Sequence, residues 1–146
     1  MSRGFCCGRR DIEDTCGFLR DCEQAWTDRT GRFPWVLTHI DDSTPVGMLE
    51  LNVDGHAVSV GYVISPWFQG RSFATEALTH VIEVALAEPS IWRVWATTDV
   101  DNTASVRVME KADMQREGRL RRYAVRPQLG EEPRDAYVYS AVRDRP

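Results

Sequence analysis

Three strand-forming runs joined by very short turns place the strongest constraint on what this chain can fold into. The runs are Pro34–Ile40, Val46–Asn52 and Ala57–Ile64. Only DDSTP and a four-residue segment that begins with VDG separate them, and Asp54-Gly55 is a typical hairpin turn. Because parallel strands need a long crossover and antiparallel strands do not, the spacing predicts an antiparallel meander.

The period of the apolar residues changes after Ser65-Pro66. Apolar side chains then recur at helical spacing until Glu88-Pro89 ends the pattern, at Phe73, Ala77, Val81 and Ala85. A short aromatic-rich strand, Ile91–Thr97, follows. A strand, a helix and a strand in this order predict a right-handed crossover between two parallel strands.

The remaining segments add a helix before the meander, and a helix and two strands after the crossover. The first helix is expected over Asp11 to Asp28, with an apolar face formed by Ile12, Cys16, Leu19, Cys22 and Trp26. The later elements are expected at Asn102–Ala112, Met114–Leu120 and Asp135–Val142. We therefore expect one domain over residues 1–146, with a mixed α/β sheet whose first half is antiparallel.

Charge and composition argue against several classes of protein. The formal net charge of -4 argues against nucleic-acid binding, which needs a concentrated basic face, although REGRLRR (116–122) is a local exception. No apolar run approaches the roughly 20 residues of a membrane span, and the start lacks the apolar region of a secretory signal. A cytoplasmic protein without a membrane partner is expected. No metal is expected, because zinc-site spacing is absent from the four cysteines, Cys6, Cys7, Cys16 and Cys22.

The segment QGRSFA follows the third strand and opens the second helix, which is a suitable place for an anion. The free N–H groups and the dipole of a helix N-terminus attract negative charge. Gly70 lets the backbone approach, Arg71 adds charge and Ser72 can donate a hydrogen bond. The segment matches neither a Walker A loop nor a dinucleotide fingerprint, so an ordinary turn that binds nothing is an equally good interpretation of these residues alone.

Two separated motifs together resemble the GNAT superfamily of acetyl-CoA-dependent N-acetyltransferases, and most of all its ribosomal-protein alanine acetyltransferase branch. The first is the family's Q/R-x-x-G-x-G/A, matched by residues 69–74. The second is N-x-x-S followed by E-K-x-G-F/M, matched from Asn102 to Met114. The resemblance covers the chain from about Ile12 onward. It implies an α+β fold with a mixed, mostly antiparallel central sheet flanked by helices.

The resemblance also implies a binding site for acetyl-CoA. In the family the pyrophosphate lies on the backbone of the first motif, here Gln69, Gly70, Arg71, Ser72, Phe73 and Ala74. The pantetheine arm runs along a bulged strand, here ending in Tyr62, Val63 and Ile64. Asn102 would contact the cofactor, and Ser105 or Tyr123 would protonate the departing thiolate. A purely structural interpretation of Asn102 as a helix cap and Ser105 as its capping-box partner fits the same residues.

The residues beside the acceptor amine are less defined by the sequence. The candidates for a general base are Glu50, His56 and Glu117. Relatives carry glycine at the positions of Ser72 and Asp113, and aspartate tolerates the left-handed conformation that glycine would adopt there. REGRLRR could attract an acidic acceptor or the 3′-phosphate of the cofactor, or form a solvated charged face.

The resemblance leaves the family's usual first strand without an expected counterpart, since only about ten residues precede the first helix. A missing first strand exposes a sheet edge, which proteins cover by pairing or by forming a homodimer. The resemblance implies transfer of an acetyl group from acetyl-CoA to a primary amine, either a protein N-terminus or a small molecule, by direct attack. The alternative is a non-catalytic or weakly active CoA-binding relative with a truncated N-terminus.

Overall fold

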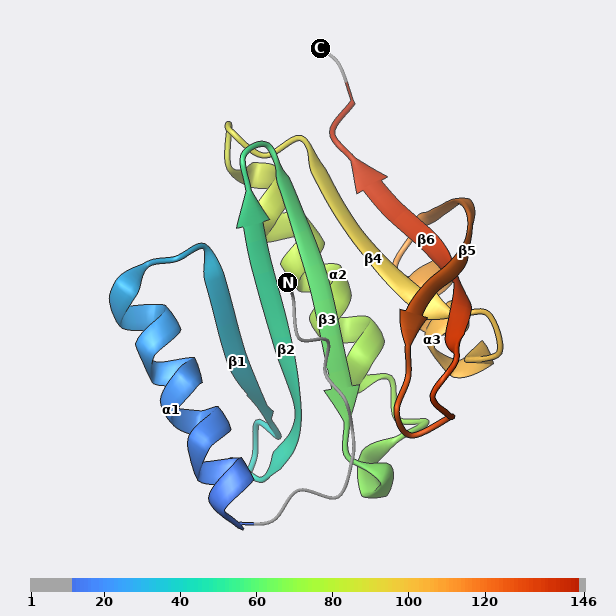
Figure 1. The fold of residues 1–146 in the computed structure, drawn as a ribbon. Helices are drawn as coiled ribbons and strands as arrows, with labels where there is room; N and C mark the ends of the chain where they lie inside the picture. The colour runs from blue at the N-terminus through green and yellow to red at the C-terminus, as the bar shows by residue number, and fades with distance from the viewer. Residues whose placement is uncertain (1–11, 145–146) are drawn as a thin grey trace.

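The computed structural model describes residues 12–144, in which three helices flank one six-stranded sheet (Figure 1). The helices are α1 (Ile12–Asp28), α2 (Phe73–Ala87) and α3 (Thr103–Lys111), and a 3-10 turn, η1, covers Pro66–Phe68. The strands are β1 (Arg32–Thr38), β2 (Pro45–Asp54), β3 (Ala57–Ile64), β4 (Arg93–Asp99), β5 (Gln115–Val125) and β6 (Pro133–Val142).

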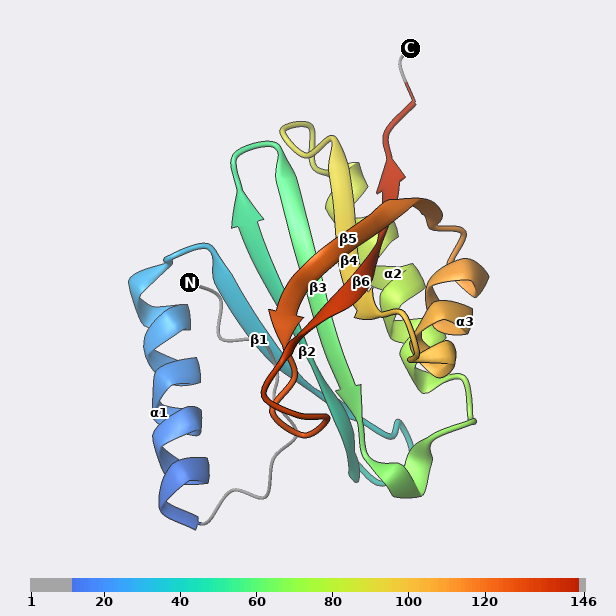
Figure 2. The same cartoon turned by 45° about the vertical axis from the view of Figure 1, so that its right-hand side comes forward.

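The sheet has the order β1-β2-β3-β4-β6-β5, and only the β3–β4 pair is parallel. The predicted antiparallel meander and the parallel connection through α2 are therefore confirmed. The fold is the mixed, mostly antiparallel one that the family resemblance implied. The helices α2 and α3 cover one face of the sheet, whereas α1 lies beside β1 (Figures 1 and 2).

The main core lies between the sheet and the helices α2 and α3. Its most deeply buried side chains come from strands and helices alike, namely Leu49, Leu78, Val94, Met109 and Tyr139. Along β3 and β4, buried residues mostly alternate with partly exposed ones, as expected for a sheet that packs helices on one face. No helix in residues 12–144 has the length and apolar character that crossing a membrane requires.

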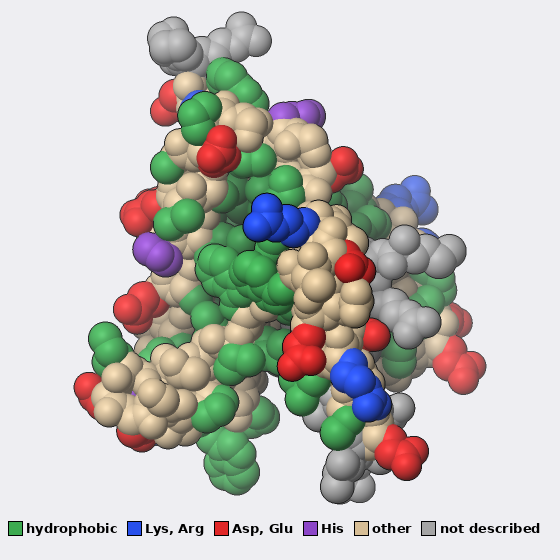
Figure 3. Space-filling model, turned by 90° about the vertical axis from the view of Figure 1, so that its left-hand side faces the viewer, with side chains coloured by type: hydrophobic (Ala, Val, Ile, Leu, Met, Phe, Trp, Pro, Cys, Tyr) green, Lys and Arg blue, Asp and Glu red, His purple; other side chains and the backbone are tan. Residues whose placement is uncertain are grey.

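The predicted apolar face of α1 is only partly buried. Cys22 and Ala25 are buried, but Leu19 and Trp26 are nearly half exposed and Cys16 is exposed. The reason is that α1 packs mainly against one strand, β1, at the edge of the sheet. Figure 3 faces this side of the molecule and shows hydrophobic side chains gathered on its surface.

The outer edge of β1 is partly blocked by α1. Gly31 O accepts a hydrogen bond from Val53 N at 2.7 Å, so Gly31 is a position bonded to β2. Bonded positions alternate along an antiparallel pair, and the backbone N and C=O of Pro34 therefore face away from β2. Pro34 has no N–H to donate, and its carbonyl already accepts a 2.8 Å hydrogen bond from Trp26 Nε1. At Pro34 this edge therefore has no N–H to offer another strand, and its carbonyl already has a partner.

Two expectations about the N-terminal end depend on residues outside the described range. No strand precedes α1 in residues 12–144. The missing first strand concerns residues 1–11, and Cys6 and Cys7 also lie there, outside the described residues. A homodimer through the sheet edge stays a prediction.

The C-terminal strands are longer than the sequence predicts. The strand β5 reaches Val125 rather than Leu120, with pairing irregularities after Arg116 and after Leu120. Most side chains of β5 are polar, because an edge strand is largely exposed, so its sequence lacks the apolar–polar alternation that predicts a strand. Ion pairs stabilise β5 instead. Arg119 Nη2 lies 2.7 Å from the carboxylate of Asp135 on β6.

Candidate active site

The site begins where β3 separates from β4. These two strands pair over only three positions, from Ala57↔Arg93 to Ser59↔Trp95. The rest of β3, through Ile64, pairs with β2 alone. The bulge expected in β3 is not present, since its register with β2 runs without a shift. Instead, the pairing between β3 and β4 ends early. Within residues 12–144, the end of β3 therefore has no paired strand on the side that faces β4.

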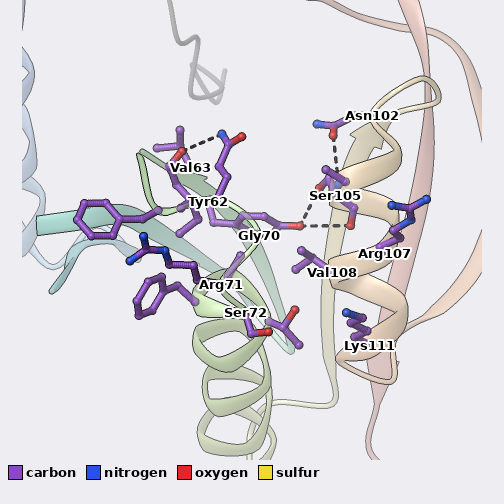
Figure 4. A pocket seen from close by; sticks show the side chains of 17 residues that line it. Tyr62, Val63, Gly70, Arg71, Ser72, Asn102, Ser105, Arg107, Val108 and Lys111 are labelled. Atoms are coloured by element: carbon purple, nitrogen blue, oxygen red, sulfur yellow. Dashed lines mark hydrogen bonds between the residues drawn. The ribbon is translucent and has the colours of Figure 1, made fainter. Parts of the chain in front are cut away.

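A cavity of about 480 Å³ lies between the end of β3, the turn before α2 and the helix α3 (Figure 4). All the residues predicted to bind the cofactor line it: Tyr62, Val63, Ile64, Gln69, Gly70, Arg71, Ser72, Phe73, Ala74, Asn102 and Ser105. The structure thus brings together two motifs that are about 30 residues apart in the sequence. Their assigned roles stay predictions.

The turn before α2 presents the helix N-terminus to this cavity. Gly70 has a φ of +76°, a conformation that favours glycine, and Gln69 Nε2 donates to Ile64 O at 3.2 Å. Ser72 precedes the helix and makes no side-chain cap. The first amides of an α-helix have no partner within the helix, and those of Phe73 and Ala74 belong to residues that line the cavity.

The helix α3 contributes a face that the sequence prediction missed. Ala104, Arg107, Val108 and Lys111 all line the first cavity. Their spacing of three and four residues places them on one side of a helix, which is a signal that the sequence already contained. Together with Arg71, two of them give this cavity three cationic side chains, and no aspartate or glutamate of residues 12–144 lines it. The cavity is therefore suited to a polyanion.

Asn102 and Ser105 do not form a closed capping box. Asn102 Oδ1 accepts a 3.1 Å hydrogen bond from Ser105 N, so the helix-cap interpretation of Asn102 is confirmed. The Ser105 hydroxyl lies 2.7 Å from the Tyr62 hydroxyl instead of returning to the cap (Figure 4). Interpreting Ser105 as a capping-box partner is therefore wrong for its side chain, and the hydroxyl is directed toward the cavity-lining tyrosine.

A second cavity, of about 600 Å³, lies on the other side of the end of β3. Four residues line both cavities: Tyr62, Val63, Asn102 and Ser105. The Tyr62–Ser105 hydrogen bond therefore stands where the two cavities meet. Burial raises the pKa of the Tyr62 hydroxyl, which keeps it protonated near neutral pH. The arrangement is that of a site in which two molecules could approach each other from opposite sides.

Residues 2–115, well over half of the chain, match the family described as the acetyltransferase (GNAT) domain. The chain belongs to the GNAT acetyltransferase family. A relative from Bacillus subtilis (strain 168), the uncharacterized N-acetyltransferase YoaA, is 31% identical over 137 residues, which cover 92% of this chain and 75% of that protein.

Solved GNAT structures have the same fold. The microcin self-immunity acetyltransferase MccE, solved with acetyl-CoA and AMP, matches with a TM-score of 0.81 at 20% identity over 92% of this chain and 73% of its own. RimL, a ribosomal-protein acetyltransferase solved with coenzyme A, matches with a TM-score of 0.80 at 20% identity over 92% and 75% of the two chains. The neighbours thus include the ribosomal-protein enzymes that the sequence resembles.

Among the base candidates in this GNAT chain, only Glu50 lines the second cavity. It is 7% exposed, and its carboxylate accepts a 2.9 Å hydrogen bond from Arg32 Nε. His56 lies in the β2–β3 turn and lines neither cavity. Glu117 lies outside both cavities, where hydrogen bonds from Arg93 and Ser140 lower its pKa to about 2. The structure thus disfavours His56 and Glu117 as bases.

Tyr123 lines the second cavity but not the first, and its side chain is 46% exposed. The hydroxyl that meets Ser105 is that of Tyr62, which the sequence prediction had assigned only to cofactor binding. Tyr62 and Ser105 are 43 residues apart, so no local sequence pattern could have paired them.

The arginines of REGRLRR are placed away from the first cavity. Arg116 stacks on Tyr137, while Arg119 and Arg122 form ion pairs with Asp135 and Glu132. None of the four arginines of this segment lines the cavity. The interpretation as a charged surface face therefore fits the structure better than a role at the 3′-phosphate.

The two positions at which the GNAT pattern loses glycine both adopt left-handed conformations. Asp113 has a φ of +58° and ends α3, with Asp113 N bonded to Glu110 O and Met114 N bonded to Met109 O. The prediction that aspartate tolerates this conformation is confirmed. Ser72 has a φ of +65°.

Replacing Ser72 by glycine is expected to stabilise the fold without weakening cofactor binding. The left-handed conformation costs a non-glycine residue about 1–2 kcal/mol, and glycine loses about 0.5–1 kcal/mol through its greater freedom in the unfolded chain. We expect the free energy of unfolding to rise by roughly 0.5 kcal/mol, measured by urea denaturation. Ser43→Gly, at another left-handed serine outside both cavities, is the matched control. A large loss of acetyl-CoA affinity in Ser72→Gly alone would mean that the hydroxyl binds phosphate.

Proposed function

We propose that this protein transfers the acetyl group of acetyl-CoA to a primary amine, a protein N-terminus or a small molecule, by direct attack. The observation that carries the proposal is the meeting of two cavities at the Tyr62–Ser105 hydrogen bond. The first cavity has the charge that acetyl-CoA needs, and the second is open to a second reactant.

The residues of the first cavity fit the cofactor chemically. Coenzyme A carries several phosphate charges, and the cavity has three cationic side chains, no carboxylate side chain and a helix N-terminus. Arg71 would be positioned by its stacking on Phe68, with its guanidinium carbon 5.8 Å from the ring centroid. Tyr62, Val63 and Ile64 form the wall that leads from this charged end toward Ser105.

The cofactor, when bound, supplies an acetyl thioester whose thiolate leaves as the amine attacks. In our proposal the Ser105 hydroxyl gives a proton to that thiolate, and the Tyr62 hydroxyl beside it holds and supports Ser105. A tyrosine hydroxyl is protonated near neutral pH, and burial raises the pKa of Tyr62 further, so Tyr62 can donate to Ser105 Oγ as the serine proton leaves. Tyr123, in the second cavity only, is the alternative donor.

The acceptor must lose a proton before it attacks. An α-amino group titrates near 8 and a lysine-like amine near 10.4, so the first needs less assistance. Glu50 is the base that we assign, because its buried carboxylate lines the second cavity on β2 opposite Gly61 of β3. Its ion pair with Arg32 holds the carboxylate in place.

Calorimetric titration with acetyl-CoA, followed by thiol release with a panel of amines, tests this function. We expect saturable binding and release of free thiol only when an amine acceptor is present. Neither heat nor a thermal shift at millimolar cofactor would overturn the proposal. Binding without thiol release for any α-amine, polyamine or lysine-containing peptide would identify the non-catalytic CoA-binding alternative.

A further inference from the structure

The second cavity has one cationic side chain without an ion-pair partner. Five charged residues line this cavity: Glu50, Asp99, Asp101, Arg126 and Arg134. Their pairing decides what charge an acceptor would meet there, because a buried or half-buried charge is screened less than one in open solvent.

All three carboxylates of the cavity already have guanidinium partners. Glu50 lies 2.7 Å from Arg32 Nη2. Asp99, which is 5% exposed, accepts from Arg134 Nε at 2.6 Å, and Asp101 lies 2.5 Å from Arg134 Nη2. The guanidinium groups of Arg32 and Arg134 therefore offset much of the negative charge that these carboxylates would present to an acceptor.

Arg126 differs from the other charged residues. It is half-buried directly after the last residue of β5, Val125, and it has no ion pair with any residue in the range 12–144. Its charge acts on Asp99, where it is a small contribution to the lowered pKa of that carboxyl after the larger one of Arg134. Arg126 thus keeps its guanidinium donors for a molecule in the cavity.

We propose that the acceptor carries an anionic group, a carboxylate or a phosphate, which Arg126 binds while the amine lies at the Tyr62–Ser105 end of the same cavity. This inference rests on the proposed function, because it assigns the second cavity to the acceptor. A guanidinium suits both anions, since its planar donors match two oxygens at once. Arg126 is then a specificity residue, and amines with an anionic substituent are the preferred substrate class.

Binding of acetylated peptide amides to the CoA-saturated protein tests the inference without requiring turnover. The probes are N-acetyl-Ala-Glu-amide, its glutamine counterpart and its lysine counterpart, measured by calorimetry. N-acetyl-Ala-phosphoserine-amide and the unphosphorylated form make a second pair that separates phosphate from carboxylate. We expect the anionic member of at least one pair to bind about tenfold tighter than its neutral partner.

Three variants identify the residue responsible. Arg126→Gln should remove the preference for the anion, and Arg126→Glu should make the lysine peptide the tightest of the three. Arg121→Gln is the matched control, since Arg121 is an exposed arginine on β5, five residues before Arg126, and does not line the cavity. This variant should keep the preference.

Equal binding of charged and neutral peptides, or no binding of any peptide, overturns the inference, and so does a preference that survives in Arg126→Gln. If the wild-type protein binds CoA to saturation before the peptides are added, the outcome of the peptide titrations leaves the proposed function unaffected. If CoA itself does not bind, the proposed function fails and the inference falls with it.

Discussion

Acetyl transfer by Ser105→Ala is expected to be about 100-fold slower than transfer by the wild-type protein. The variant loses the hydroxyl that lies between the two cavities and keeps the backbone N–H that Asn102 caps, so α3 should still form. Affinity for acetyl-CoA should change by less than about threefold, because one neutral hydroxyl contributes little to the binding of a polyanion. Thiol release at saturating cofactor measures the turnover, and calorimetry measures the affinity.

Tyr62→Phe separates the supporting role from the catalytic one. The substitution removes the Tyr62 hydroxyl, which lies 2.7 Å from the Ser105 hydroxyl. We expect acetyl transfer to slow by about tenfold, which is the effect of losing one hydrogen bond. Because Tyr62 acts through Ser105, the double variant should be no slower than Ser105→Ala, which is a non-additivity that general destabilisation would not produce. Thr103→Ala removes a hydroxyl from the first turn of the same helix, outside both cavities, and should have no effect. A larger loss in Tyr123→Phe than in Ser105→Ala would transfer the proton-donor role to Tyr123.

Neutralising Arg107 and Lys111 together is expected to weaken acetyl-CoA binding by about 30-fold, or about 2 kcal/mol at roughly 1 kcal/mol for each partly exposed charge. Both side chains line the first cavity from one face of α3 and have no ion pair with any residue in the range 12–144. Their charges are thus available to phosphate. Calorimetric titration of Arg107→Gln/Lys111→Gln with acetyl-CoA measures the effect.

Salt and a distant double variant serve as controls for this result. The difference between wild type and variant should shrink as ionic strength rises, because added salt screens partly exposed charges. Arg20→Gln/Arg121→Gln removes the same total charge from exposed positions outside the first cavity and should bind normally. Wild-type affinity in Arg107→Gln/Lys111→Gln would mean that the phosphates lie elsewhere.

Local chemistry was a good guide wherever one segment decides its own conformation. The hairpin expected at Asp54-Gly55 is present, with Gly55 and His56 forming the β2–β3 turn directly after Asp54, and Asn102 caps α3 as its position suggested. Asp113 takes the left-handed conformation in place of glycine. Each of these outcomes depends on backbone preferences and hydrogen bonds within a few residues, so they can be predicted from a short stretch of sequence.

Predictions that depended on which surface an element meets were less successful. The apolar residues of α1 have helical spacing, yet Leu19 and Trp26 stay largely exposed because the helix meets the edge of the sheet rather than its face. The strand β5 extends past Leu120 although its residues do not alternate, because pairing with β6 and ion pairs such as Arg119–Asp135 stabilise it. Burial and strand pairing are set by distant segments, and a local pattern does not contain them.

The motifs at the turn before α2 and at the start of α3 indicated a GNAT cofactor site through the family resemblance, and that assignment stays a prediction. The chemistry between them required the folded chain. The early end of β3–β4 pairing opens the space for two cavities, and it brings Tyr62 within 2.7 Å of Ser105. The same packing pairs Asp99 and Asp101 with Arg134 and leaves Arg126 without an ion pair in the described part of the chain. Charges that lie far apart in sequence acquire their partners only when the sheet closes, so the electrostatics of the acceptor cavity follow from its tertiary contacts.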